Sequence, residues 1–160
     1  MITTKITIKS HLKEYIIGKF AGCVDGPVEF PDKTDIYYTI WDLTERRPVN
    51  CPPDKGNIEI KLPVRREGKP PATYNYLGVR SHKIIERKIE NMFFAELHEM
   101  LTEEKHRYGI AYIEAIYSFT KKYNINSISE DGLKKDYYRW KDILYRRKKR
   151  GYERKNILMT

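Results

Sequence analysis

Cationic and aromatic side chains alternate along the last 27 residues of the chain. Residues 134–160 hold eleven lysines and arginines against three acidic residues, a balance of +8. Guanidinium, ammonium and phenol groups can all donate hydrogen bonds to phosphate oxygens. The side chains that we expect to contact phosphates are Lys134, Lys135, Tyr138, Arg139, Tyr145, Arg146, Arg147, Lys149 and Arg150.

This positive charge is concentrated at one end of the chain. The sequence of 160 residues carries a formal net charge of +9, so residues 1–133 contribute a balance of only +1. A nearly neutral body with a cationic end predicts a polyanionic partner, and we favour DNA over RNA. The last cationic stretch, residues 148–155, could lie along phosphates or enter a minor groove. The alternative is a solvated helix face that binds nothing specific.

The segment 115–144 has the pattern of two helices joined by a short connection. Ile116 and Phe119 predict an apolar first helix. Leu133 and Tyr137 predict an amphipathic second helix. The pattern resembles the helix-turn-helix of small DNA-binding and accessory proteins of bacteriophages and bacterial mobile elements. This resemblance implies that the second helix lies in a major groove while the first braces it. The connection is longer than usual and lacks glycine, so an ordinary antiparallel helical hairpin is the alternative.

Acidic residues and histidines come closest to a metal site near residue 100. These residues are Glu96, His98, Glu99, Glu103 and His106. A di-iron site needs further carboxylates on a facing helix, where the sequence offers only Glu114. A magnesium-dependent nuclease site could draw on Asp42, Glu59 or Glu86, but the sequence gives no reason to choose among them. We therefore expect no bound metal, no cofactor and no enzymatic activity, with a metal-dependent nuclease as the least favoured alternative.

No sequence feature predicts export or a membrane span. Cys23 and Cys51 have no Cys-x-x-Cys partner, which argues against a zinc site but leaves a single disulfide between them open. The N-terminus lacks the apolar segment of a signal peptide, and no run approaches roughly 18 apolar residues. We expect a cytoplasmic protein, or a virion component if the chain belongs to a phage, with no membrane partner.

Apolar spacing predicts the elements of the N-terminal part. Isoleucines alternate with polar residues over 2–9 and over 58–62, which predicts two strands that pair in a small antiparallel sheet. Helical spacing predicts one helix over 10–21, with Ser10 as its N-cap, and another over 35–45.

The C-terminal part is predicted to be helical throughout. We expect helices over 81–101, with Ser81 as the N-cap, over 109–123, and from Ser129 onward. On the last helix, four residues fall within about 60° of one another and predict one narrow buried stripe. They are Leu133, Tyr137, Trp140 and Leu144.

The sequence as a whole predicts a mainly helical α+β fold with about five helices, a two-stranded antiparallel sheet and a C-terminal helix-turn-helix-like hairpin. We expect an α+β body over 1–107 and a basic helical hairpin over 108–160, connected through 102–108 and packed as one compact unit. The favoured function is non-enzymatic binding of nucleic acid, specifically duplex DNA. The alternative is a structural or assembly protein, such as a homo-oligomer or a phage component, whose basic end contacts DNA or an acidic partner.

Overall fold

The computed structural model describes residues 2–21, 26–65 and 68–158, and the side chains of these residues as far as residue 150. Its described elements confirm the mainly helical α+β fold with a small antiparallel sheet. Cys23, one half of the disulfide left open above, lies outside the described residues. In chain order the elements are β1 (Thr3–Ile6), α1 (Ser10–Phe20), α2 (Asp35–Leu43), β2 (Glu45–Arg46), β3 (Ile58–Lys61), β4 (Tyr74–Tyr76), α3 (Val79–Tyr108), α4 (Tyr112–Lys122) and α5 (Glu130–Leu158).

The strand pair expected from the alternating isoleucines is present. Strands β1 and β3 are antiparallel, with Ile6 opposite Ile58 and Thr4 opposite Ile60. Because successive side chains point to opposite faces of a strand, these four residues share the core-facing side, and all four are buried. Val28 adds a parallel bridge to Ile60.

The sequence does not predict the second ladder, between β2 and β4. The expected end of the 35–45 helix is wrong, because α2 stops at Leu43. Thr44 turns the backbone to an extended conformation, and its hydroxyl donates to the carbonyl oxygen of Trp41 at 2.7 Å. Glu45 then pairs with Tyr76 instead of continuing the helix.

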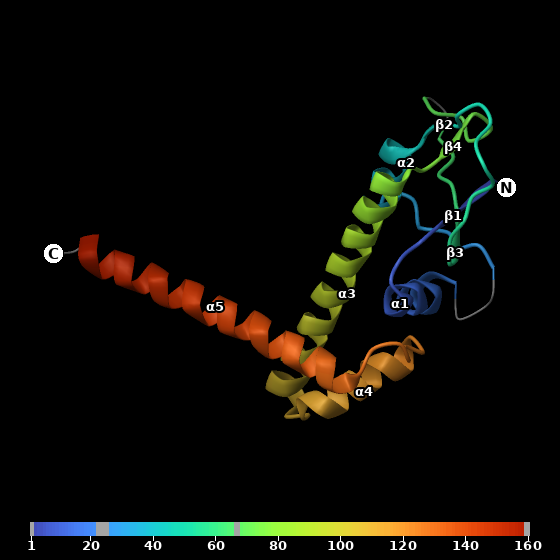
Figure 1. Ribbon diagram of the computed structural model, residues 1–160. Helices are drawn as coiled ribbons and strands as arrows, with labels where there is room; N and C mark the ends of the chain where they lie inside the picture. The colour runs from blue at the N-terminus through green and yellow to red at the C-terminus, as the bar shows by residue number, and fades with distance from the viewer. Residues whose placement is uncertain (1, 22–25, 66–67, 159–160) are drawn as a thin grey trace.

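Helix α3 is the element on which the others pack. It runs from strands β2 and β4 to helices α4 and α5 (Figure 1) and contacts α1, α2 and α4 along the way. Phe93, near its middle, makes edge-to-face contacts with the rings of Tyr15 at 5.2 Å and Phe119 at 5.5 Å. The buried stripe of α3 has four-residue spacing and consists of Ile85, Ile89, Phe93, Leu97 and Leu101.

Three of the helices begin at residues other than the predicted ones. Helix α4 starts at Tyr112 instead of 109, because Gly109 is the residue that ends α3. Helix α3 starts at Val79 with Gly78 in the N-cap position, so Ser81 is a buried residue of the first turn. Lys9 occupies the N-cap position of α1, and Ser10 is already helical. In both cases the serine lies near the true start, so local capping preference marked the region but missed the terminal residue.

The end of α3 also differs from the prediction. The helix continues past Leu101 through the polar segment 102–108 until Gly109, whose φ of 65° ends it. The expected connection over 102–108 is therefore wrong, because this segment is a helical extension. Apolar periodicity could not reveal it, since most of its side chains are exposed.

Glu96 joins three helices from a partly buried position on α3. Its carboxylate, on α3, accepts hydrogen bonds from the hydroxyls of Tyr15 and Tyr123 and from Lys19 Nζ at 2.8 Å. Partial burial alone would raise the pKa of Glu96, but the three hydrogen bonds favour the charged form more strongly, so this pKa lies below its usual value. Burial, together with the same carboxylate, raises the pKa of both tyrosines, which keeps them protonated as donors.

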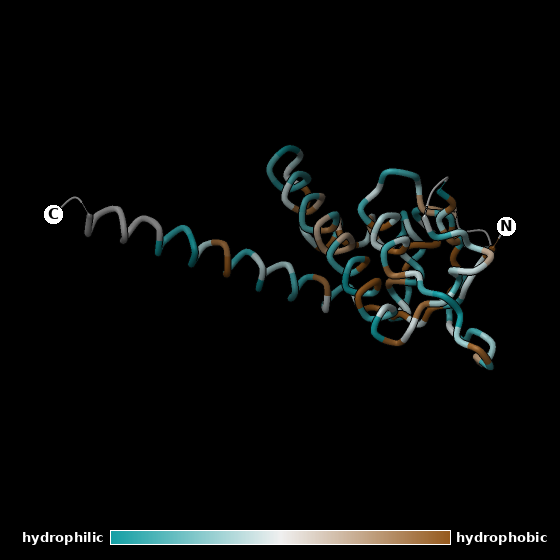
Figure 2. Tube along the Cα trace, turned by 90° about the horizontal axis from the view of Figure 1, so that it is seen from above, coloured by the Kyte–Doolittle hydropathy of each residue, from teal (hydrophilic) through white to brown (hydrophobic). Residues whose placement is uncertain are grey.

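Helix α5 leaves the body. Its first turns lie against α4, and its C-terminal half projects away from the other elements (Figures 1 and 2). At about 1.5 Å per residue, its 29 residues extend about 43 Å. No helix of the described residues combines the length and the apolar character needed to cross a membrane.

We expect Gly18→Ala to destabilise the protein. A Cβ at this position on α1 would lie 2.6 Å from the backbone oxygen of Tyr123, at the end of α4. Gly→Ala in an open helix stabilises by about 0.5–1 kcal/mol, but crowding against fixed backbone should instead cost about 1–3 kcal/mol. Urea unfolding measures the difference, with Gly132→Ala as the control because a Cβ there would approach one side-chain atom, Ser129 Oγ at 3.0 Å, and no backbone of another element. A stabilised Gly18→Ala protein would contradict the close approach of α1 to α4.

The ionised Glu96 carboxylate should make part of the free energy of unfolding sensitive to acid. Because the pKa of Glu96 is lowered by folding, its ionised form stabilises the protein fully above the unfolded-state pKa of about 4.3. This stabilisation is lost as the pH falls through the lower folded-state pKa. We expect Glu96→Gln to be less stable at pH 7 and to lose less stability than the parent between about pH 5 and 3. Chemical unfolding across this range tests it, with the exposed Glu99→Gln as control; parallel curves for Glu96→Gln and the parent would refute it.

Candidate nucleic-acid interface

The turn between α4 and α5 is closed without a glycine. Helix α4 ends at Lys122, and Asn124 then adopts the left-handed conformation, with φ of 54°. Asparagine tolerates this conformation better than most residues, so Asn124 does what glycine usually does in such turns. The backbone N–H of Ile125 donates to the carbonyl oxygen of Thr120 at 2.8 Å, and the Ile125 side chain is buried.

Helix α1 also holds this turn. The carboxylate of Glu14 accepts hydrogen bonds from the backbone N–H groups of Asn126 and Ser127 and from the Ser127 hydroxyl. The expected start of the last helix is confirmed, since Ser129 Oγ accepts from the backbone N–H of Gly132 at 3.0 Å. Contacts from the body therefore fix where α5 begins and in which direction it leaves.

The first turns of α5 are anchored on α3. The hydroxyls of Tyr137 and Thr102 hydrogen-bond to each other at 2.8 Å. Nε2 of the buried His98 lies 2.8 Å from a carboxylate oxygen of Asp136. The indole of Trp140 stacks on the His98 ring, with centroids 4.5 Å apart. The His98 side chain therefore contacts α5 twice: its ring nitrogen is within hydrogen-bond distance of Asp136, and its ring stacks on Trp140.

The predicted buried stripe of α5 is correct for its first half only. Leu133 and Tyr137 are buried, whereas Trp140 and Leu144 are partly exposed. The helical phase of these residues is as expected. However, α5 crosses α3 near His98 and Thr102 and then runs away from it, so the far part of the stripe is covered only in part by the described elements (Figure 1).

All nine side chains expected to contact phosphates lie on α5, and eight of them are exposed, Lys134 being partly buried. Two have a carboxylate one turn away: Lys135 pairs with Asp131 at 3.0 Å, and Arg146 pairs with Asp142 at 3.1 Å. Exposed pairs of this kind contribute roughly 0–1 kcal/mol, so both cations can still bind phosphate.

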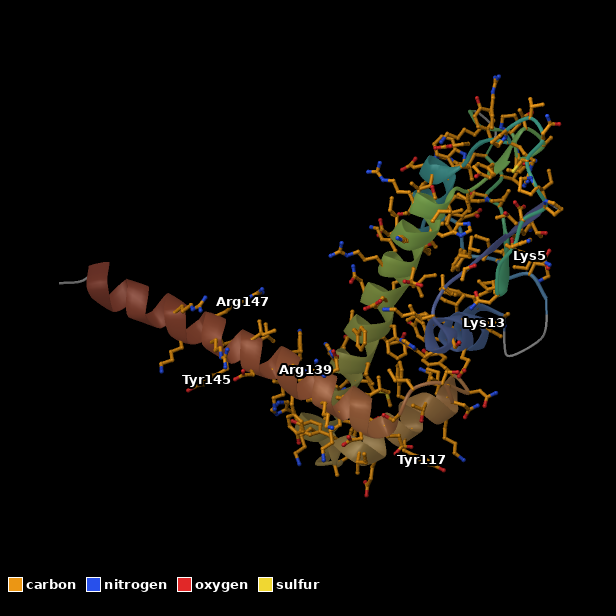
Figure 3. All side chains as sticks on the ribbon, in the orientation of Figure 1. Lys5, Lys13, Tyr117, Arg139, Tyr145 and Arg147 are labelled. Atoms are coloured by element: carbon orange, nitrogen blue, oxygen red, sulfur yellow. The ribbon has the colours of Figure 1, made fainter. Side chains whose placement is uncertain are left out.

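The distal cations surround the helix instead of forming one face. Residues 146–150 are five consecutive lysines or arginines, all exposed. Successive residues of an α-helix are about 100° apart, so five in a row cover every direction around the axis. Figure 3 shows Tyr145 and Arg147 on opposite sides of α5. This part of α5 has no apolar side with which to pack on its own body.

Lys141 belongs to the same surface, although the sequence did not single it out. Its Nζ donates to the hydroxyl of Tyr112 at 3.0 Å. This hydrogen bond lowers the pKa of the Tyr112 phenol and raises the pKa of Lys141, so the lysine keeps its charge. Glu14 was missed, and His98 was considered only for a metal site, because their partners are distant in the sequence and no local pattern connects them.

The residues considered for a metal site point to different partners. Glu96 is bonded to two tyrosines, His98 faces Asp136, and Glu103 pairs with Arg107 at 3.0 Å. Within the described residues, no three His, Cys, Asp or Glu side chains are placed to hold one metal ion. The carboxylates considered for a nuclease lie on α2, β3 and α3 and are Asp42, Glu59 and Glu86.

Comparison of the chain with protein-family models, with curated proteins and with solved structures finds no match. Helices α4 and α5 do form the expected pair joined by residues 123–129, but α5 is far longer than the part of it that packs on the body. Function therefore has to be inferred from the surface chemistry of α5.

Because α5 is anchored at one end only, we expect substitutions to cost less stability the farther along α5 they lie. Tyr137→Ala should cost about 3–5 kcal/mol, because it removes a buried aromatic ring. Trp140→Ala should cost less, since Trp140 is partly exposed, and Arg147→Ala should change stability by less than about 0.5 kcal/mol. Urea unfolding of the three variants checks the order. An Arg147→Ala loss as large as that of Tyr137→Ala would show that the distal half of α5 packs on the body.

Proposed function

We propose that this protein binds duplex DNA without catalysing a reaction, through the exposed cationic half of α5. The observation that supports this proposal most strongly is the run 146–150, in which five consecutive exposed cations lie on a helix that projects from a nearly neutral body. A helix of this charge gains nothing from packing on its own body. It gains most from a partner that is densely and regularly negative.

The dimensions favour a duplex. The major groove of B-DNA is about 12 Å wide and admits an α-helix, with phosphates along both walls. Cations on all sides of residues 146–150 could contact both walls at once. The major groove of A-form RNA is deep and narrow, which makes double-stranded RNA a poorer fit.

Binding to blunt duplex DNA at several salt concentrations tests this proposal. If five or six cations neutralise phosphates, log K should fall against log salt with a slope of roughly −5. The variant Arg146→Gln/Arg147→Gln/Lys149→Gln/Arg150→Gln should bind weakly and lose about 3–4 units of slope. These residues are exposed and lie beyond the anchored turns, so the variant should fold normally.

A matched variant controls for net charge. Lys5, Lys55, Lys83 and Arg87 are exposed cations of the body, and changing them to glutamine removes the same four charges from the total of +9. We expect this control to retain most of the affinity and the salt slope. Equal losses in both variants, or an affinity of the parent that does not depend on salt, would rule out α5 as the DNA-binding element.

A further inference from the structure

A groove lies where α5 leaves α3. Its volume is about 250 Å³, and its walls come from the C-terminal end of α3 and the middle of α5. The residues lining it, all in the described part of the chain, include no carboxylate: Thr102, His106, Tyr137, Trp140, Lys141, Leu144, Tyr145 and Lys148. It is smaller than the roughly 300–1,000 Å³ of pockets that enclose drug-sized ligands, so it suits a single ring system.

Apolar and aromatic groups form one part of this groove. Trp140 stacks on His98 with one face, which holds its ring in position, and it also lines the groove. Leu144 is partly exposed beside it, and Tyr145 is 68% exposed at the outer end. A planar ring entering the groove would meet one aromatic side chain that is held in place and one that is exposed.

Cations form the other part. The ammonium group of Lys141 is held by Tyr112 and lies 5.6 Å from the centre of the Tyr137 ring. Lys148 is exposed one turn beyond Leu144. Aromatic side chains next to ammonium groups suit a ligand that joins a planar ring to an anion, and a nucleotide unit has this composition.

We propose that this groove binds an unpaired base of single-stranded DNA, next to the duplex bound by residues 146–150. This inference rests on the proposed function. In a duplex the faces of the bases are stacked on one another, and only their edges are accessible in the grooves. An aromatic groove is therefore useful only for a base outside the helix, which predicts a preference for DNA with a single-stranded end.

A second copy of this chain fits the groove less well. A second copy that inserted its own α5 here would bring a helix that is cationic on all sides over residues 146–150. Lys141 and Lys148 would repel it, and the groove offers no carboxylate to compensate. Charge complementarity thus favours a nucleic-acid strand.

Two labelled DNAs test the inference: a blunt 20-base-pair duplex, and the same duplex with a ten-thymidine tail, compared by fluorescence anisotropy at equal salt. We expect the tail to raise the affinity about tenfold, in line with base–aromatic stacking. Trp140→Leu should abolish this preference and leave binding to blunt duplex unchanged. The control Trp41→Leu alters the tryptophan of α2 and should retain the preference.

A second measurement does not depend on a variant at Trp140. In Trp41→Phe protein, Trp140 is the sole tryptophan, and the tailed DNA should quench its emission whereas blunt duplex should not. Equal affinity for both DNAs without quenching would overturn the inference and leave the proposed function intact. No binding to either DNA would refute both. A doubling of mass in sedimentation without DNA, with a matching change in Trp140 emission, would assign the groove to a second copy instead.

Discussion

The packing of other elements on one stripe of α3 is the constraint on which the structure depends. Its residues recur every fourth position from Ile85 to Leu101, so they form a row that winds partly around α3, and helices from both ends of the chain pack along it. Phe93, near the middle of that row, contacts rings from α1 and α4. The buried stripe ends at Leu101, and Thr102, the next residue, bonds Tyr137 where α5 crosses α3.

The cationic half of α5 lies away from the core because α5 leaves α3 after its first turns. Helix α5 is anchored while it lies beside α3, through Tyr137 and through His98 with its two partners. Its last hydrogen bond to another element, among the described residues, runs from Lys141 to Tyr112. The distal lysines and arginines therefore lose little hydration on folding and need no hydrogen-bond or packing partners in the core. Their number can change without a corresponding change in stability.

The sequence predictions that proved correct were those that rested on local periodicity. Alternating isoleucines identified β1 and β3, and helical spacing identified all five helices and Ser129 as a cap, because these signals lie within a few residues of one another. The ladder of β2 with β4, the extension of α3 and the bond from Glu14 to the turn depend on partners far along the chain or on exposed residues. No local pattern encodes them.

Trp140 shows why the site was harder to predict than the fold. Its helical phase correctly assigned it to the side of Leu133 and Tyr137, but phase specifies direction and not what lies in that direction. Whether a core-facing aromatic residue is buried depends on how long its neighbour stays beside it, here on where α5 crosses α3 and leaves it. The same geometry that leaves Trp140 partly exposed places it next to the cations of α5. A groove with both aromatic and cationic walls therefore lies where α5 leaves α3, and a ligand bound there can contact both kinds of side chain.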